Sequence, residues 1–528
     1  MHVLTADQAA SLIQNDWTLT VGGFGHCGAP ESLMAALERR FLSTGLPRRL
    51  SLMFASGAGD REANGVNRLA HPGLLSRIVG GFWSLAPRIG RMVAANQIEA
   101  HNWPQGVVSH MFRAIASGRD GVLSEVGLGT FIDPAQEGGC LNAQTVLPLV
   151  ERTQVAGRDS LLYRSMPLNC ALLRGTRADE RGNITMEREA NLQDVLAQAQ
   201  AVRNSGGIVI VQVLEIAKSG SIPPQLVKIP GILVDYVVVA ERNEHWQTYG
   251  EPYNPAYTGE WSAGRMAASP EDESSAARRI VGRRALLELM RMAHGCERRR
   301  PLVVNLGIGT PEAIAEQARL AGMTHDPSFT FTVESGAVGG TPAGGMSFGA
   351  TAYPEAVLSQ AELFDHYDGG GIDIAFLGFG QIDRQGRVNV ASLGDRLNGV
   401  GGFVNISQAA KRIVFCGSFT AAGLELDCGQ DGLQIVREGD VRKLVDQVGR
   451  ICYDPAGRAR CTTPLVITER AVMRMDASGL EVIEIAPGVD LERDVLAQSD
   501  IALRVSPELT TMPAAAFAGG LLDVPFMT

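Results

Sequence analysis

The feature that most constrains the fold of this chain is a regular alternation of short apolar segments and longer helical segments. Glycine-rich turns separate them. The apolar runs, rich in β-branched residues, are 18–21, 50–54, 207–213, 302–305, 329–333 and 372–377. The segments with helical composition are 31–41, 192–202, 277–293 and 312–321. Apolar strands separated by helices are typical of sheets that are covered on both faces. The sequence therefore predicts an α/β fold with mostly parallel sheets.

The chain also repeats itself. Residues 171–184 and 375–388 share a strand–turn–strand pattern, in which Asp179 and Asp383 hold matching positions 204 residues apart. A second strand-like run follows each copy, and residues 28–31 and 309–312 both lead from a glycine turn into a helix. We therefore expect two related α/β units at 1–240 and 276–528, the first enlarged by an insertion, with a linker at 241–275.

The end of that linker carries a helix-start signal. Ser269 and Pro270, followed by two acidic residues, provide an N-cap and a first helical turn. The helix that follows contains arginines interleaved with apolar residues, which predicts a solvated amphipathic face. These arginines are Arg278, Arg279, Arg283, Arg284 and those at 298–300.

Length and charge restrict the class of protein. A chain of 528 residues is longer than one hydrophobic core commonly spans, which agrees with two units. Its 47 basic and 57 acidic side chains give a net charge of −10, which argues against an electrostatic nucleic-acid partner. The apolar runs are far shorter than the roughly 20 residues of a membrane helix. The start of the chain does not resemble a secretory signal. We expect a cytoplasmic protein with no membrane partner.

The eight cysteines are scattered without the close pairing of a structural zinc site. We therefore expect reduced, mostly buried thiols and no metal site.

Two glycine motifs point to common enzyme classes, and their contexts disfavour both. Residues 23–28 read GxGxxG between a strand and a helix, as in a dinucleotide site, but the acidic residue expected about 20 positions later is absent. Residues 345–349 read GxSxG, but a glycine-rich segment stands where a nucleophile elbow needs a strand. A nicotinamide-dependent dehydrogenase and a serine hydrolase are therefore weak alternatives.

A more informative pattern surrounds Glu334. Residues 329–334 alternate strictly between apolar and polar side chains, and a glycine-rich turn follows. Glu334 is thus expected at the carboxyl end of a parallel strand, where open α/β sheets bind ligands. The alternative is a purely structural role, in which the Glu334 carboxylate only accepts hydrogen bonds from the amides of the turn. Further glycine turns at 306–309 and 399–402 can direct backbone N–H groups toward an oxyanion if the fold brings them together.

Several motifs together resemble the class I coenzyme A transferases. Residues 22–30 are similar to the first signature of that family, 305–311 to its NLGIGxP turn, and 333–336 to its catalytic glutamate motif. The Ser and Asn that flank this Glu in succinyl-CoA:3-ketoacid transferases are absent. The chain looks closer to the single-chain acetate/propionate branch. Further stretches similar to that branch are residues 104–106, 126–131, 368–373 and 399–403. The resemblance covers nearly the whole chain.

The resemblance implies covalent catalysis by Glu334. In that scheme a short-chain acyl-CoA gives a mixed anhydride and then a γ-glutamyl-CoA thioester, and a carboxylate acceptor reverses the steps in ping-pong order. Coenzyme A and acyl-CoA enter as substrates, and no prosthetic group is required. The family also implies a homodimer or homotetramer.

The resemblance assigns further site residues as expectations. Oxyanion donors are placed at the backbone of Ile308 and Gly401. Contacts to coenzyme A are expected at Gly307, Gly309, Met346, Phe348 and Gly402. Contacts to the substrate are expected at Gly23, Phe24, Gly25 and His26. An acyl-CoA hydrolase on the same fold and a non-catalytic acyl-CoA sensor remain alternatives.

Overall fold

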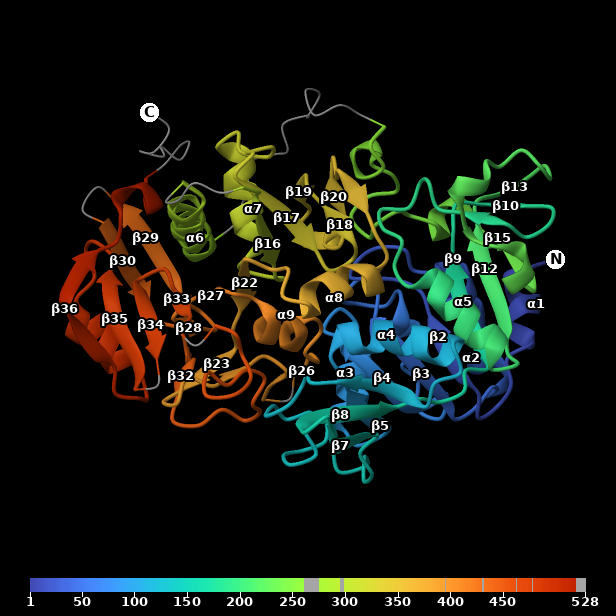
Figure 1. Ribbon diagram of the computed structural model, residues 1–528, viewed down its shortest axis with the longest axis horizontal. Helices are drawn as coiled ribbons and strands as arrows, with labels where there is room; N and C mark the ends of the chain where they lie inside the picture. Colours follow the sequence, from blue (N-terminus) through green and yellow to red (C-terminus); the bar gives the residue numbers. More distant parts are fainter. Residues whose placement is uncertain are drawn as a thin grey trace.

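The structure is a computed structural model that describes residues 1–260, 275–294, 299–394, 396–429, 432–461, 463–476 and 478–518. Two large sheets lie side by side, one in each half of the chain (Figure 1). Three helices pack at the junction of the halves. They are α4 (Gln105–Ala116), α8 (Gln360–Asp368) and α9 (Phe403–Ala409). The predicted α/β class is confirmed.

The N-terminal sheet has eight strands, paired in parallel throughout, in the order β1-β15-β12-β9-β2-β3-β4-β5. Its strands are β1 (His2–Leu4), β2 (Thr18–Val21), β3 (Leu50–Ser56), β4 (Leu75–Phe82), β5 (Glu99–Asn102), β9 (Cys170–Arg174), β12 (Ile208–Val213) and β15 (Tyr236–Val239). The other helices of this half are α1 (Ala6–Ser11), α2 (Glu31–Thr44), α3 (Pro87–Ala94) and α5 (Val195–Asn204). Central strands such as β9 are buried along their whole length, as a sheet covered on both faces requires.

The C-terminal sheet has ten strands in the order β21-β18-β17-β16-β22-β27-β33-β34-β35-β36. Its strands are β16 (Leu302–Leu306), β17 (Phe329–Val333), β18 (Ala337–Val338), β21 (Ala356–Val357), β22 (Ile374–Gly378), β27 (Ile413–Cys416), β33 (Leu465–Ile467), β34 (Ala471–Asp476), β35 (Gly479–Ile485) and β36 (Arg504–Thr511). Five of them, from β17 to β33 in sheet order, form a parallel centre. Helices α6 (Ala276–His294) and α7 (Glu312–Leu320) belong to this half.

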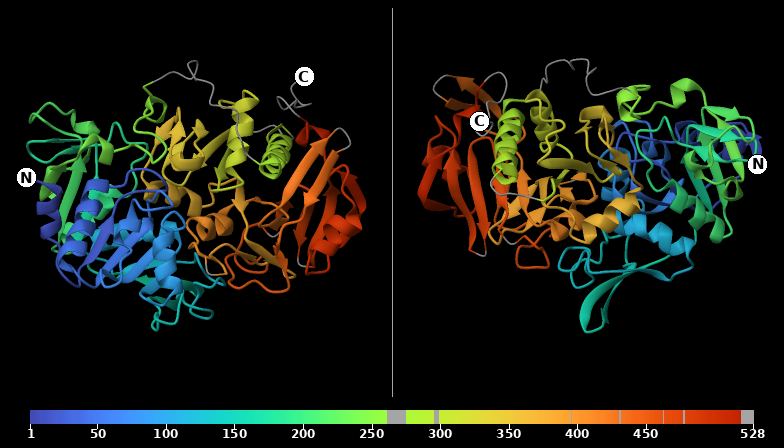
Figure 2. Two further views of the ribbon diagram at one scale, coloured as in Figure 1. Left: turned by 180° about the vertical axis from the view of Figure 1, so that it is seen from behind. Right: turned by 45° about the horizontal axis from the view of Figure 1, so that its top comes forward.

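Smaller sheets decorate both halves. In the first half these are β10 (Arg177–Asp179), β11 (Ile184–Thr185), β13 (Glu215–Ala217) and β14 (Val227–Ile229), and separately β6 (Gly121–Ser124), β7 (Val150–Val155) and β8 (Arg158–Arg164). In the second half they are β23 (Gln381–Asp383), β24 (Val388–Asn389) and β32 (Leu444–Val445), with the pairs β19 (Thr341–Pro342) and β20 (Thr351–Ala352), β25 (Ser392–Leu393) and β26 (Arg396–Leu397), β28 (Thr420–Ala421) and β31 (Val441–Arg442), and β29 (Glu425–Gly429) and β30 (Gly432–Arg437). The hairpin β7–β8 projects from the body of the molecule (Figure 2).

The predicted repeat is confirmed in three dimensions. Strands β9 and β22 hold equivalent places, and each is followed by a small antiparallel hairpin. The hairpin turns close in the same way, because Asp179 Oδ1 accepts from the Asn183 N–H at 2.9 Å and Asp383 Oδ1 from the Arg387 N–H at 3.1 Å. Strands β12 and β27 then pair in parallel with β9 and β22. The chain therefore contains two related α/β units.

The proposed linker is only partly within the described residues. Its helix-start signal at Ser269 and Pro270 lies outside them, so the division at 240 and 276 stays a prediction. The described part packs on both halves: the Tyr249 hydroxyl donates to Glu31 at 2.8 Å, and the Tyr353 N–H donates to the Ala256 carbonyl at 2.8 Å.

The prediction of a solvated arginine face on α6 is wrong for Arg283 and Arg284, which are buried. The Arg284 guanidinium contacts Glu484 at 2.7 Å and Glu288 at 3.5 Å. Arg283 donates to the Ala518 carbonyl. Sequence spacing cannot show that α6 is covered by the C-terminal strands, since Glu484 lies 200 residues away. Arg298 lies outside the described residues.

In the part of the chain that the structure describes, no helix is long and apolar enough to cross a membrane.

Candidate active site between the two halves

Glu334 follows β17 directly, at the carboxyl end of a strand in the parallel centre of the C-terminal sheet. The predicted strand, 329–333, has the bounds that the structure gives. The strict alternation predicted for it places Thr332 and Glu334 on one face, and both are buried. Glu334 is 8% exposed.

A short chain of polar groups holds the Glu334 carboxylate. Asn305, on the neighbouring strand β16, donates through Nδ2 to Glu334 Oε2 at 3.2 Å. The same amide lies 3.4 Å from the hydroxyl of Tyr367 at the end of α8, and this hydroxyl donates to Thr332 Oγ1 at 2.7 Å. Burial raises the pKa of Glu334, and the hydrogen bonds of its own backbone and of Asn305 oppose that shift. A carboxylate desolvated in this way is a stronger nucleophile than one in water.

The carboxylate faces a cavity of about 400 Å³. Both halves of the chain line it, and five phenylalanines give it a largely apolar wall. These are Phe24, Phe82, Phe348, Phe379 and Phe403. Sequence reasoning singled out two of the five, and missed Phe82, Phe379 and Phe403. Phe379 directly follows the repeated strand β22, which is the signal that could have found it.

Most of the predicted site residues meet at this cavity. Those in its lining are Phe24, Gly307, Ile308, Gly309, Glu334, Phe348, Gly401 and Gly402. Met346 is 37% exposed and lies against Gly250, outside the lining that the described residues form.

The first glycine loop serves mainly to join the halves. A Cβ on Gly25, where φ is +61°, would stand 2.7 Å from the Phe348 carbonyl oxygen, so only glycine permits this approach. The His26 N–H donates to the same carbonyl at 3.0 Å, and the Phe24 and Phe348 rings lie 5.9 Å apart. The Gly23 N–H donates to Gln193 Oε1 at 2.5 Å. Phe24 is the member of this set that reaches the cavity.

His26 points into the protein. Its Nδ1 lies 2.6 Å from the Gly59 carbonyl oxygen, and the residue is 1% exposed. Burial lowers the pKa of this imidazole to about 4, so it is neutral at pH 7. This geometry favours a turn-stabilising role over direct contact with substrate.

The backbone donors expected for an oxyanion differ in their availability. The Gly401 N–H donates to the Gly81 carbonyl at 2.9 Å, across the junction of the halves. Among the described residues none accepts from the N–H of Ile308 or of Gly402. Ile308 and Gly402 are therefore better placed to donate to a ligand than Gly401.

The residues of the weaker motifs are occupied by structural contacts. The Ser347 hydroxyl pairs with that of Thr248 at 2.9 Å, on a short 3-10 turn rather than at a strand end. A Cβ on Gly28 would overlap the Gln193 side chain, so the GxGxxG loop packs on protein.

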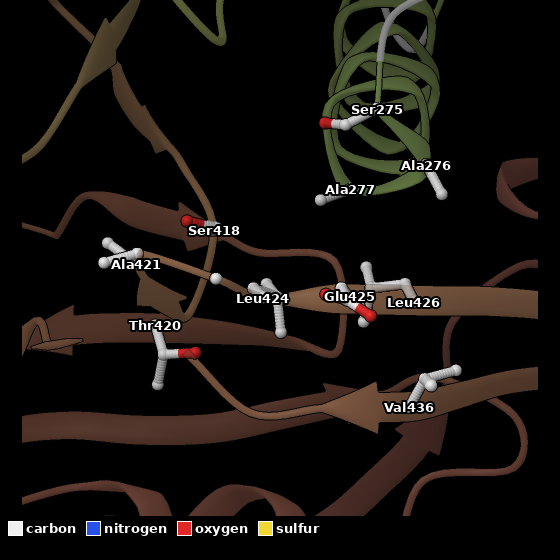
Figure 3. A pocket seen from close by; sticks show the side chains of 12 residues that line it. Ser275, Ala276, Ala277, Ser418, Thr420, Ala421, Leu424, Glu425, Leu426 and Val436 are labelled. Carbon is white, nitrogen blue, oxygen red and sulfur yellow. The ribbon is translucent and has the colours of Figure 1, made fainter. Parts of the chain in front are cut away.

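A second cavity, of about 620 Å³, lies at the first turn of α6, over β29 and β30 (Figure 3). Small and apolar side chains such as Ala277, Leu424 and Val436 surround it together with Glu425. None of the predicted site residues is among the described residues that line it.

The comparisons with known proteins agree with this arrangement. The family model described as Coenzyme A transferase matches residues 3–240. A caffeate CoA-transferase of Acetobacterium woodii is 40% identical over 98% of this chain and 97% of the relative. The acetate CoA-transferase YdiF of Escherichia coli (strain K12) is 37% identical over 97% of this chain and 94% of the relative. The crystal structure of the E. coli O157:H7 acyl-CoA transferase YdiF, as a thioester complex with CoA, superposes with a TM-score of 0.89 at 36% identity, covering 99% of this chain and 97% of that one.

The fold and these similarities define an enzyme that transfers coenzyme A. The chain belongs to the coenzyme A transferase family and is a CoA-transferase of the single-chain, class I kind.

Proposed function

We propose that this CoA-transferase moves coenzyme A from a short-chain acyl-CoA to a carboxylic acid through a covalent γ-glutamyl-CoA thioester on Glu334. The observation that carries the proposal is the position of Glu334, a buried carboxylate at a strand end that lines the cavity between the two halves. The thioester named for the YdiF complex is consistent with this chemistry.

The proposed reaction begins with attack by a Glu334 carboxylate oxygen on the acyl carbonyl carbon of the donor thioester. The C–S bond breaks, which leaves an acyl-glutamyl anhydride and the coenzyme A thiolate. The thiolate then attacks the Glu334 side-chain carbonyl carbon, and the anhydride C–O bond breaks to release the first carboxylate. An acceptor carboxylate repeats the two steps in reverse and regenerates Glu334. Two easier acyl transfers thus replace one direct exchange.

The environment of Glu334 suits each step. The apolar wall desolvates the carboxylate, while the Asn305 amide fixes its orientation at 3.2 Å. The N–H groups of Ile308 and Gly402 are candidate donors for the tetrahedral oxyanions, and removing such a donor typically costs about 2.7–4 kcal/mol.

The decisive experiment is to incubate the enzyme with acetyl-CoA alone and to analyse the peptide that bears Glu334 by mass spectrometry. We expect the mass of coenzyme A on that peptide and its loss after borohydride reduction. An unmodified peptide would contradict the covalent mechanism.

Free coenzyme A release separates transfer from hydrolysis. In the absence of an acceptor acid a transferase releases one equivalent of acetate and keeps coenzyme A on Glu334 as the thioester, whereas an acyl-CoA hydrolase releases free coenzyme A continuously. Release that is unaffected by added acetate would favour the hydrolase.

A further inference from the structure

The two halves line the catalytic cavity with different chemistry. Besides Glu334 and Asn398, the C-terminal half contributes glycine backbone and apolar side chains. The N-terminal half contributes two phenylalanines and a group of four polar side chains. These polar residues are Ser56, Arg61, Ser84 and Gln105.

Arg61 is held in an unusual backbone conformation. Its φ is +69°, in the left-handed region that an arginine rarely adopts. The adjacent Asp60 fixes the loop, because its Oδ1 accepts from the N–H groups of Glu62, Ala63 and Asn64 at 2.8–2.9 Å. The Arg61 N–H donates to the Leu85 carbonyl at 2.9 Å. Backbone strain that the surroundings maintain in this way is concentrated at functional sites.

Within the described residues the positive charge of Arg61 is left without an ion-pair partner. Both oxygens of Asp60 bond to its own loop, the second to Asn64 Nδ2 at 2.7 Å. No carboxylate among the described residues lies within ion-pair distance of the Arg61 guanidinium, which is exposed at the cavity. In the described lining, Arg61 is the cation and Glu334 the anion.

Two hydroxyls accompany this cation. Ser56 is 3% exposed and lines the cavity, and no described residue is in hydrogen-bond contact with its hydroxyl. Ser84 lines the same cavity, and its hydroxyl likewise has no partner among the residues the structure describes. Ser84 is half-buried, and within the described residues both hydroxyls are free to bond to a ligand in the cavity. A guanidinium and two hydroxyls that line one cavity offer it hydrogen-bond donors suited to carboxylate oxygens.

We propose that Arg61, with the hydroxyls of Ser56 and Ser84, binds a second carboxylate of the substrate, so that this CoA-transferase prefers short dicarboxylic acids. One carboxylate reacts at Glu334 while the other is bound at Arg61. The inference rests on the proposed function. Once Glu334 is converted to the neutral thioester, the described lining carries only the positive charge of Arg61. The binding of a dianionic acid is therefore favoured most at this stage.

The test uses acids matched in length, with acetyl-CoA as the donor. Succinate is compared with butyrate, and glutarate with valerate, by kcat/KM for the acceptor. We expect the wild-type enzyme to favour the dicarboxylic member of each pair. Arg61→Gln should lower kcat/KM for succinate and glutarate by about 10- to 100-fold and leave butyrate and valerate within about twofold. Arg61→Lys should retain part of the preference, because it keeps the charge but not the bidentate geometry.

Controls separate this role from others. Arg88→Gln removes a positive charge on α3 from a residue that is not in the described lining, and it should leave the preference unchanged. Equal losses on all four acids would mean that Arg61 acts on coenzyme A or on the fold, and would overturn the proposal. An unchanged preference in Arg61→Gln would overturn it too.

The first half-reaction tells the two proposals apart. Adduct formation on Glu334 from acetyl-CoA involves no second carboxylate, so Arg61→Gln should form the adduct at the wild-type rate. Absence of the adduct in the wild-type enzyme would refute the proposed function. If the adduct forms but the wild-type enzyme accepts the dicarboxylic and monocarboxylic acids equally well, only the role of Arg61 is refuted.

Discussion

Ala55 holds in the N-terminal sheet the position that Glu334 holds in the C-terminal sheet. Strand pairing establishes the correspondence, because Ala171 of β9 pairs with Thr20 and Ala375 of β22 pairs with Asn305. In turn Thr20 pairs with Met53, and Asn305 pairs with Thr332. Met53 lies two residues before Ala55, and Thr332 lies two residues before Glu334. The residues that follow also match, since 55–58 read Ala-Ser-Gly-Ala and 334–337 read Glu-Ser-Gly-Ala. Of these two copies of one strand end, the C-terminal one carries the carboxylate that we propose as the nucleophile.

Replacement of Glu334 should therefore remove transfer entirely. Glu334→Gln keeps the shape of the side chain and its contact with Asn305 but cannot form an anhydride. We expect kcat to fall by at least about 10³-fold, as for the loss of other covalent nucleophiles. Steady-state transfer from acetyl-CoA measures this effect. The control is Glu355→Gln. Glu355 is an exposed carboxylate that follows β17 later in the chain, and this variant should retain full activity.

Much of the half that contains Glu334 could be predicted, because its strands and turns follow from residues that are neighbours in the sequence. The strand bounds at 18–21 and 329–333 follow from runs of β-branched and apolar residues, and they match the structure. The position of Glu334 follows from the end of one such run. The repeat was visible because Asp179 and Asp383 close identical turns.

The remainder depends on contacts that are distant in sequence. The burial of Arg284 requires Glu484 on β35, and the orientation of His26 requires the Gly59 carbonyl. The availability of the glycine N–H groups depends on where the other half docks, which decides that Gly401 bonds to Gly81. No local pattern contains this information.

The pH dependence of adduct formation should report the burial of Glu334. The proposed nucleophile must be ionised to react, and burial raises the pKa of this carboxyl above 4.5. As the pH is lowered, the rate of adduct formation should therefore begin to decline at a higher pH than it would with an ordinary carboxyl. Asn305→Ala removes a hydrogen bond that favours the ionised form, so it should move this decline to still higher pH. Tyr367→Phe leaves that bond in place and should move it less. An unchanged profile in Asn305→Ala would contradict the role of the amide.

The availability of the Gly402 N–H can be tested with proline. The φ of Gly402 is −77°, which proline tolerates, and the residue is the N-cap of α9, so its N–H is not needed within the helix. Gly402→Pro should lower kcat by about 10²- to 10³-fold if this N–H stabilises an oxyanion. Gly402→Ala introduces a tight contact 3.1 Å from Ile406 but keeps the donor, and should retain most activity. Thermal unfolding of both variants gauges the cost of the added atoms. Equal losses of kcat in the two variants would assign the effect to packing.

Asp194 should make the junction of the halves less stable as the pH rises. This carboxyl accepts from Ser109 at 2.8 Å and from Gln360 at 3.0 Å, and burial raises its pKa from 3.8 to about 7. Between those values the folded protein binds a proton that the unfolded chain has released. The contribution is therefore fully present below pH 3.8 and is lost as the pH passes 7. Asp194→Asn does not titrate, so its melting temperature relative to the wild type should be higher at pH 8 than at pH 5. A difference between the two proteins that is the same at both pH values would contradict the assignment.

The burial of Arg284 predicts a large effect of its removal on stability. Its guanidinium compensates Glu484 at 2.7 Å and Glu288 at 3.5 Å, and Glu288 is 4% exposed. Arg284→Ala leaves these carboxylates without that partner in a poorly solvated place, although Arg291 still contacts Glu288. We expect the free energy of unfolding to fall by about 3 kcal/mol, as for other broken buried pairs. Arg39→Ala removes an exposed pair with Asp7 and should change the free energy of unfolding by at most about 1 kcal/mol. Denaturant titration of the two variants under the same conditions measures both values, and similar small losses in the two would show that the α6 pair contributes no more than a surface contact.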